Sequence, residues 1–153
     1  MMIEIRIQSE PFDPNLEIDL LRHGNPGVGS VVSFLGLMRD LNQDEYVSAM
    51  NLEYYPGMTE KAVRSIVEEA NRRWELSGCR VIHRVGELYP TDVIVLVAVA
   101  SAHRGEAFQA CEFIIDYLKT RAPFWKKEIT LKGTRWVDAR SSDHAAEKKW
   151  KFD

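Results

Sequence analysis

Cysteine is scarce in this 153-residue chain, which has only Cys79 and Cys111, far apart in the sequence. No CxxC pair and no cluster of cysteine and histidine occurs, so neither a zinc site nor dithiol redox chemistry is expected. The first residues form no apolar signal segment, and so few thiols fit a reducing compartment, so we expect a cytoplasmic protein. Both cysteines are expected to be small buried hydrophobic residues.

Long apolar runs are also absent. No stretch approaches the roughly 18 consecutive apolar residues that a membrane helix needs, so we expect no membrane span. A GxSxG elbow, a Walker loop and carboxylates at metal-ligand spacing are missing too, so we expect neither a metal nor a cofactor. The remaining composition, 45% hydrophobic and 28% charged residues in 17.6 kDa, is typical of one soluble globular domain with its own core.

The charge is unevenly distributed along the chain. The net charge is −3, yet the segment from Lys119 to Arg140 contains seven basic residues and two acidic ones. A basic segment on an acidic protein favours a compact anionic ligand or an acidic partner, or else is a solvated basic face. Duplex nucleic acid is not expected as a partner, because it requires a broad basic face.

Hydrophobic periodicity predicts a chain that alternates strands and helices. Residues 58–75 and 104–121 are predicted as two long amphipathic helices, and residues 14–24 as a short one. The continuous apolar stretch 93–100 is expected to be a central strand covered on both sides. This order predicts an α+β fold with two long helices on a mixed sheet. The predicted strands are 3–7, 31–38, 46–55, 80–85, 93–100, 124–131 and 135–138.

His103 and Arg104 follow an apolar strand and open the second long helix. A helix N-terminus has free N–H groups and a positive dipole end, so this turn suits a phosphate group, although a solvated arginine is the open alternative. Lys119, in the last turn of the same helix, is roughly 22 Å away at about 1.5 Å per residue. A single straight helix cannot bring both groups to the same small ligand. One of them must therefore come from a neighbouring chain, or the chain must follow a bent path. For Lys119 alone, the alternative is a lysine that stabilises the helix dipole.

Lys126 and Glu128 lie on one predicted strand. Period-two alternation places them on one face with Phe124, and their Cα atoms are about 6.6 Å apart, close enough to bracket a reacting group. We expect this face to be open, and the alternative interpretation is an exposed charge pair. The other face is expected to turn to the core, and its residues are Trp125, Lys127, Ile129 and Leu131.

Two further polar residues lie within or directly after apolar strands. Arg39 follows the strand 31–38 and either offers a guanidinium fork for phosphate or is a solvated loop arginine. His83 lies within an apolar strand and is expected to be a core histidine with satisfied hydrogen bonds.

Five stretches, in order along nearly the whole chain, resemble the large catalytic subunit of molybdopterin synthase. The most specific is KTRAPFWKKE at residues 119–128, and SAHR at residues 101–104 is the second. The other three are residues 53–62, 83–88 and 135–137.

The resemblance implies an α/β hammerhead fold. Residues 1–140 are then a single catalytic domain with a β subdomain inserted at roughly 37–55, and residues 141–153 are a polar C-terminal tail. It also implies a homodimer that binds one small ubiquitin-like sulfur-carrier subunit at each end, which makes a heterotetramer. The substrate is then cyclic pyranopterin monophosphate. The reaction installs the two sulfurs of the molybdopterin dithiolene, supplied by the thiocarboxylate on the carrier's C-terminal Gly-Gly tail.

The resemblance also implies a set of site residues. Lys119 and Lys126 are the expected catalytic residues, with Lys119 acting as a general acid/base or forming a transient covalent adduct. A crowd of cations favours the neutral amine that such a role needs. Arg140 is expected to reach into the site of the partner protomer. The expected substrate-binding residues are Leu37, Met38, Arg39, His103, Arg104, Lys119, Lys126, Lys127, Glu128 and Arg140.

Two non-catalytic interpretations stay open. One is an adaptor that docks a ubiquitin-like partner through its basic segment, and the other is a module that binds phosphate esters without sulfur chemistry. Both predict a basic surface, but neither accounts for lysines on both sides of Pro123 together with Glu128 on the same strand face as Lys126.

Overall fold

A four-stranded sheet forms the body of the computed structural model, which describes residues 1–138 and 141–150. Its strands are β1 (Met2–Gln8), β2 (Ser30–Leu37), β5 (Gly78–Arg84) and β7 (Val93–Ser101), in the order β1-β5-β7-β2. β1 and β5 run parallel, and the other neighbours are antiparallel. β7 is central and mostly buried, which confirms the expectation from its continuous apolar sequence.

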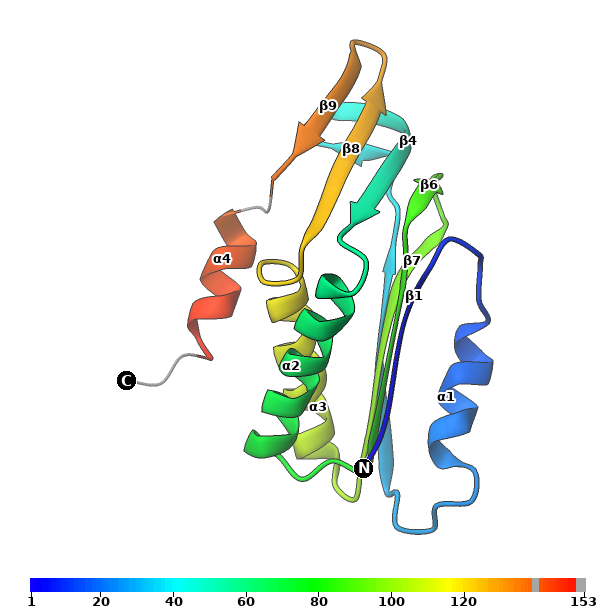
Figure 1. The fold of residues 1–153 in the computed structure, drawn as a ribbon, viewed down its shortest axis with the longest axis vertical. Helices are drawn as coiled ribbons and strands as arrows, with labels where there is room; N and C mark the ends of the chain where they lie inside the picture. The colour runs from blue at the N-terminus through cyan, green and yellow to red at the C-terminus, as the bar shows by residue number, and fades with distance from the viewer. Residues whose placement is uncertain (139–140, 151–153) are drawn as a thin grey trace.

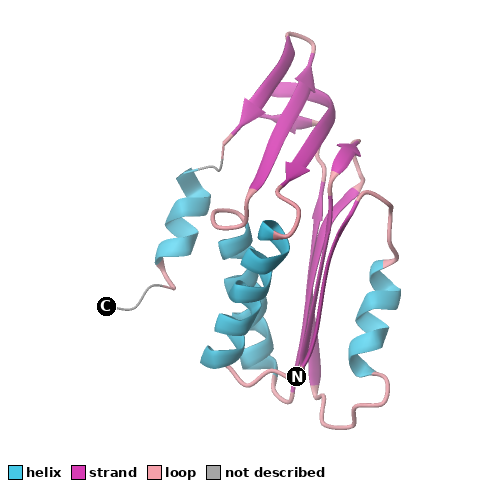
Figure 2. Cartoon of the chain, viewed as in Figure 1, coloured by secondary structure: helices cyan, strands magenta, loops and turns pink. Residues whose placement is uncertain are grey.

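Helices cover both faces of this sheet (Figures 1 and 2). α2 (Met58–Arg73) and α3 (Arg104–Leu118) lie side by side on one face, and α1 (Pro14–Arg22) lies on the other. The main core fills the space between the two long helices and the sheet, where Val67, Val97 and Ile114 are fully buried. The apolar stripes of 58–75 and 104–121 therefore face the sheet, as their periodicity predicted.

A second, five-stranded sheet extends from one end of the first, at the top of Figure 1. It consists of β3 (Leu41–Asn42), β4 (Glu45–Tyr54), β6 (Gly86–Leu88), β8 (Phe124–Thr130) and β9 (Gly133–Val137). β4 pairs with β3, β6 and β8, and β8 pairs with β9, all antiparallel. The β subdomain that we expected at roughly 37–55 thus supplies β3 and β4, and the other three strands come from later in the chain.

The C-terminal segment contains a helix, α4 (Ser141–Lys148), where we predicted only a polar tail. Glu147 is buried and accepts two hydrogen bonds from Arg121, at 2.7 and 2.9 Å. Trp150 packs edge-on against Trp74 and Phe113. These contacts join the C-terminal segment to residues that are distant in sequence. The composition of the segment does not reveal such contacts, so it predicted only a polar tail.

The predicted α+β class and the two long helices are confirmed. The short strands β3 and β6 were not predicted, because two or three residues carry no periodic signal. None of the helices in the described ranges is long and apolar enough to cross a membrane.

A buried ion cluster holds α1 against the sheet. Glu17 on α1 is 4% exposed and accepts hydrogen bonds from Arg80 on β5, at 2.8 Å, and from Arg6 on β1. Burial by itself raises the pKa of the Glu17 carboxyl, but the hydrogen bonds and charges of the two guanidinium groups outweigh it and hold the pKa below its usual value.

We expect Glu17→Gln to lower the free energy of unfolding by about 3 kcal/mol near neutral pH, because the buried Arg80 loses its charge partner and Arg6 keeps only the longer contact to Glu4. Since the native pKa is lowered, the carboxylate stabilises the fold above the unfolded carboxyl pKa of about 4.3, and this contribution is lost as the pH falls through the native pKa. Urea unfolding of both proteins near pH 7 and near pH 3 measures the effect. A stability difference that is the same at both pH values would show that charge pairing is not what Glu17 contributes.

Candidate active site

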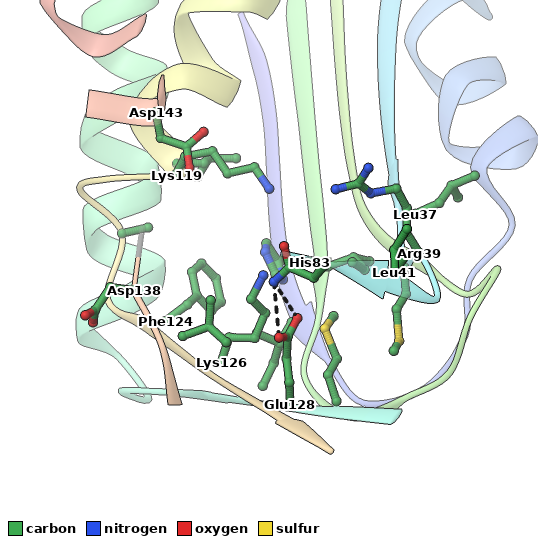
Figure 3. A pocket seen from close by; sticks show the side chains of 18 residues that line it. Leu37, Arg39, Leu41, His83, Lys119, Phe124, Lys126, Glu128, Asp138 and Asp143 are labelled. Carbon is green, nitrogen blue, oxygen red and sulfur yellow. Dashed lines mark hydrogen bonds between the residues drawn. The ribbon is translucent and has the colours of Figure 1, made fainter. Parts of the chain in front are cut away.

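A cavity of about 350 Å³ lies where the two sheets meet the C-terminal end of α3 (Figure 3). This volume is in the range of sites for small molecules. The cavity wall combines the end of β2, the β3–β4 hairpin, β5, the end of α3 and β8. Six of the ten residues that the sequence analysis assigned to the site line it, namely Leu37, Met38, Arg39, Lys119, Lys126 and Glu128.

Three cations from three different elements line this cavity. Arg39 follows β2, Lys119 is the C-cap residue of α3, and Lys126 lies on β8. In Figure 3 the Lys119 amine and the Arg39 guanidinium point toward each other across the cavity. Cations from several sides of a small cavity form a site for an anionic ligand, and the arginine adds a planar fork suited to a phosphate or a carboxylate.

The backbone beside Arg39 is clamped to a neighbouring turn. A bulge just before Leu37 ends the regular pairing of β2 with β7. The Met38 N–H then donates to the Asp92 carbonyl, and the Thr91 N–H donates to the Met38 carbonyl, both at 2.9 Å. Met38 is buried, whereas Leu37 and Arg39 on either side of it are exposed. The clamp at Met38 therefore determines where the Arg39 guanidinium can reach.

The turn between α3 and β8 brings Lys119 and Lys126 to the same cavity. Pro123 disfavours helical geometry in the residue before it, so the chain leaves α3 ahead of this proline. Thr59, at the start of α2, is fully buried and donates its hydroxyl hydrogen to the Pro123 carbonyl at 2.9 Å. This contact holds the turn, and β8 then runs along the cavity wall.

Glu128 is 4% exposed and has hydrogen bonds on both carboxylate oxygens. Asn42 donates to the two oxygens at 2.9 and 3.1 Å, and Arg135 donates twice to Oε1, at 3.0 and 3.1 Å. Arg135 also pairs with Glu45 at 3.0 Å. The Glu128 carboxylate is therefore engaged in holding the β3–β4 hairpin and β9 against β8, and it serves the site as an anchor of the cavity wall.

The orientation of β8 is the reverse of the predicted one. Phe124, Lys126 and Glu128 share a face, as predicted, but this face lines the cavity and Glu128 is buried. Trp125 is 46% exposed and Leu131 is 97% exposed, whereas we placed both in the core. The prediction was wrong because it assumed that the apolar side chains of the strand face inward, and here the inner wall is polar.

Three of the assigned residues that the structure describes, His103, Arg104 and Lys127, do not line the cavity of the single chain. His103 is the N-cap residue of α3 and Arg104 is its first residue. Both are exposed, at the opposite end of the helix from Lys119, which is the separation that the sequence predicted. Lys127 belongs to the other face of β8, with its amine 5.4 Å from the centroid of an aromatic ring on β9. Arg140 lies outside the described residues.

Four polar residues that line the cavity were missed by the sequence analysis, namely Asn42, His83, Asp138 and Asp143. His83 stands in a strand that is otherwise mostly buried and apolar, so periodicity carries no signal for a functional histidine there. Asp143 lies on α4, which was not predicted. Asp138 follows β9, and only its place near the basic segment hinted at the site.

His83 is held in one orientation within the wall. Its ring stacks on Phe124, with the centroids 4.0 Å apart and the planes at 18°, and Nδ1 lies 2.7 Å from the Arg84 carbonyl oxygen. Burial lowers the pKa of His83 to about 4, the Arg84 carbonyl opposes this shift, and the charge of Lys119 adds to it. The imidazole is therefore uncharged near neutral pH.

Neither cysteine offers a reactive thiol. Cys79 is completely buried and Cys111 is 4% exposed, which confirms the expectation of small buried residues. Burial raises the pKa of both thiols, that of Cys111 to about 12. A thiol that stays protonated is a poor nucleophile and a poor carrier of sulfur. Within residues 1–138 and 141–150, no group of three or more His, Cys, Asp and Glu residues is placed to hold a metal ion.

The fold and the cavity define an α+β protein with a cationic site for a small anionic ligand. A family model described as MoaE protein matches residues 7–121, and the chain belongs to this family. It is 60% identical to the molybdopterin synthase catalytic subunit of Ralstonia nicotianae over 149 residues, which are 97% of this chain and 85% of the relative. It is 53% identical to the molybdopterin synthase catalytic subunit of Pseudomonas aeruginosa over 146 residues, 95% of this chain and 97% of the relative.

Solved structures share the fold. The molybdopterin biosynthesis MoaE protein from Burkholderia ambifaria has a TM-score of 0.85 and 54% identity, covering 99% of this chain and all of that one. Molybdopterin synthase from Staphylococcus aureus has a TM-score of 0.79 and 34% identity, covering 86% of this chain and 94% of that one. A Helicobacter pylori complex of subunits 1 and 2 of the molybdopterin-converting factor has a TM-score of 0.70 at 16% identity, with 91% and 92% covered, which is a likeness of fold alone.

The family predicted from the sequence is confirmed by these matches. So is the predicted role of a sulfur-transferring catalytic subunit in molybdenum cofactor biosynthesis.

Proposed function

We propose that this cavity is where sulfur passes from the thiocarboxylated Gly-Gly end of a small ubiquitin-like carrier subunit to cyclic pyranopterin monophosphate, forming the molybdopterin dithiolene. The observation that carries the proposal is the convergence of Arg39, Lys119 and Lys126 on one cavity of about 350 Å³. Both reactants are anions, a phosphate ester and a thiocarboxylate, so a small cavity lined by three cations suits them together.

The buried cysteines support a separate sulfur donor. Cys79 and Cys111 are shielded from any ligand, and their thiols stay protonated near neutral pH. A protein that transfers sulfur without a reactive thiol of its own must receive the sulfur from another molecule. An extended peptide tail that enters the cavity meets this need.

We assign the substrate phosphate to Arg39, together with His103 and Arg104 of a second copy of the chain. The two ends of α3 are too far apart for one molecule to bring His103 and Lys119 to the same ligand. A homodimer in which the start of one α3 meets the cavity of the other copy resolves this distance, and Arg140 of the second copy belongs to the same arrangement. Two carrier subunits on this homodimer make the heterotetramer.

The two lysines have the chemical roles in this proposal. Lys119 acts as a general acid/base, or forms a transient covalent adduct, during sulfur attack and opening of the cyclic phosphate. Lys126 orients either the thiocarboxylate or the phosphate, while Leu37 and Met38 provide an apolar part of the wall. Glu128 keeps the β8 wall in place through Asn42 and Arg135. Lys127 faces away from the cavity and is left without a role in the reaction.

Reconstitution tests this function. Mixing the protein with a thiocarboxylated carrier and cyclic pyranopterin monophosphate should yield the dithiolene product. The matched control is Lys127→Ala, which removes a neighbouring lysine from the outward face of β8 and should leave the rate within about twofold of wild type. Carrier binding without any product would favour the adaptor interpretation, and pterin binding without sulfur transfer would favour a phosphate-ester module.

Replacing Arg39 with alanine should raise KM for the pterin substrate about 10- to 100-fold and change kcat much less, because a charge-assisted hydrogen bond to the phosphate is worth about 1.5–3 kcal/mol. Steady-state kinetics with saturating carrier measures both constants. Lys132→Ala is the control, since Lys132 is a strongly exposed cation on the β8–β9 turn and does not line the cavity. An unchanged KM in Arg39→Ala would count against the assigned phosphate contact.

The same proposal includes the cytoplasm as the place of action. Protonated, unpaired thiols such as Cys79 and Cys111 are typical of proteins in reducing compartments.

A further inference from the structure

The described wall of the cavity has to supply hydrogen-bond acceptors as well as donors. Arg39, Lys119 and Lys126 are donors only, so they can recognise a phosphate, a carbonyl or a thiocarboxylate. A reduced pterin also presents amino and ring N–H groups, which need acceptors once water is excluded. A pterin bound in this cavity therefore requires an acceptor among the side chains of the wall.

The carboxylates of the described wall either have contacts of their own or point away from the cavity. Glu128 has both oxygens bound to Asn42 and Arg135. Asp138 is exposed, and in Figure 3 its carboxylate points away from the cavity. Asp143 takes part in an interaction of its own. Among the described side chains of the wall, two neutral acceptors are present, the Asn42 side-chain oxygen, whose amide is held by Glu128, and the imidazole of His83.

The hydrogen bond of His83 determines its tautomer. The Arg84 carbonyl oxygen, 2.7 Å from Nδ1, can only accept a hydrogen bond, so Nδ1 carries the proton. Nε2 is then left with a lone pair. One face of the ring is covered by Phe124, and the ring lines the cavity, so the Nε2 edge is the polar part that it can present to a ligand.

We propose that His83 is a specificity-determining residue of this site, whose Nε2 accepts a hydrogen bond from an N–H group of the pterin ring. This inference rests on the proposed function for the identity of the ligand. The cations recognise the anionic parts of the two reactants, and His83 recognises the donor edge of the ring. Because the imidazole is uncharged near neutral pH, it adds no repulsion to the neighbouring amines.

Two amide variants separate the two nitrogens of the ring. In His83→Asn the amide nitrogen takes the place of Nδ1 and can still donate to the Arg84 carbonyl, but the acceptor at Nε2 is lost. In His83→Gln the amide oxygen can reach the position of Nε2. Asparagine should weaken the equilibrium binding of cyclic pyranopterin monophosphate about 10-fold and raise KM similarly, with kcat changed less than about threefold. Glutamine should restore most of the affinity.

Inorganic phosphate is the matched control ligand. It lacks the ring N–H groups of the pterin, so its binding should be the same in wild type and His83→Asn, and weaker in Arg39→Ala. If His83→Asn binds the pterin as tightly as wild type, or if glutamine is as impaired as asparagine, the inference is overturned. A loss of phosphate affinity in His83→Asn equal to the loss of pterin affinity would mean a collapsed cavity and would overturn it as well.

Nitrogen NMR of histidine-labelled wild-type protein gives a readout that requires no variant. The Nε2 resonance should be that of an unprotonated nitrogen and should shift when the pterin binds, whereas phosphate alone should leave it in place. An Nε2 that is protonated, or that does not shift with pterin, overturns the inference. A different result is that pterin binding depends on His83 but no dithiolene forms. This result would contradict the proposed function and would still support the His83 contact.

Discussion

Lys119→Ala is expected to lower kcat about 10²- to 10⁴-fold, because proton transfer by a well-placed side chain contributes an effect of this size. The variant should still bind the pterin, since Arg39 and Lys126 keep two cations in the cavity. Lys119 is exposed at the end of α3, so its truncation opens no hole in the core and the fold should be retained. Single-turnover formation of the dithiolene with thiocarboxylated carrier measures the rate of the chemical step.

Lys127→Ala serves as the control, because it removes the same side chain from the outward face of β8. If Lys119→Ala turned over near the wild-type rate, the chemical role would have to move to Lys126. A rise in KM with kcat unchanged would make Lys119 a binding residue only.

Two inactive variants should restore each other when mixed. If Arg104 of one copy completes the cavity that contains Lys119 of the other, a heterodimer of Arg104→Ala and Lys119→Ala has one site with both defects and one intact site. Random exchange of subunits in equal amounts should then recover about a quarter of the wild-type activity, since half of the dimers are mixed and each has one working site of two. Activity measured before and after exchange of the subunits gives this number.

Lys119→Ala mixed with Lys126→Ala is the matched control. Both lysines line the cavity of the same chain, so every site in that mixture lacks one of them and no activity should return. Recovery in the control, or none in the Arg104 mixture, would show that Arg104 does not act across the dimer. Full activity of the Arg104→Ala homodimer would remove this residue from the site altogether.

The polar residues of the cavity show which features of the site a local sequence pattern can predict. Arg39 at a strand end and Lys119 near the end of a helix were candidates from the residue type and its place in an element, the family resemblance assigned both to the site, and the structure brings them to one cavity. Phe124, Lys126 and Glu128 were placed on one strand face, which depends only on the alternation of side chains. The direction of that face was wrong, because it depends on what the strand packs against.

His83 and Glu128 needed the tertiary structure for their roles. A histidine in an apolar strand is usually a core residue. The proposed ligand contact of His83 follows only from its stacking on Phe124 and from the cavity that its ring lines. Glu128 was expected to be on an open face, but its bonds to Asn42 and Arg135 make it part of the wall. Both of these partners are supplied by other strands.

The amino-acid sequence by itself determined the family, the α+β class, the two long helices and the separation of Arg104 from Lys119, because each of these depends on residue identity and on spacing along one element. The tertiary structure alone decided that β4 pairs with β8, that α4 packs on α3, and that β8 turns the face with Lys126 and Glu128 toward the cavity. The physical reason is that a cavity is built from segments far apart in the chain. Which of them meet is set by the pairing of strands and by burial over the whole molecule, and no local pattern contains that information.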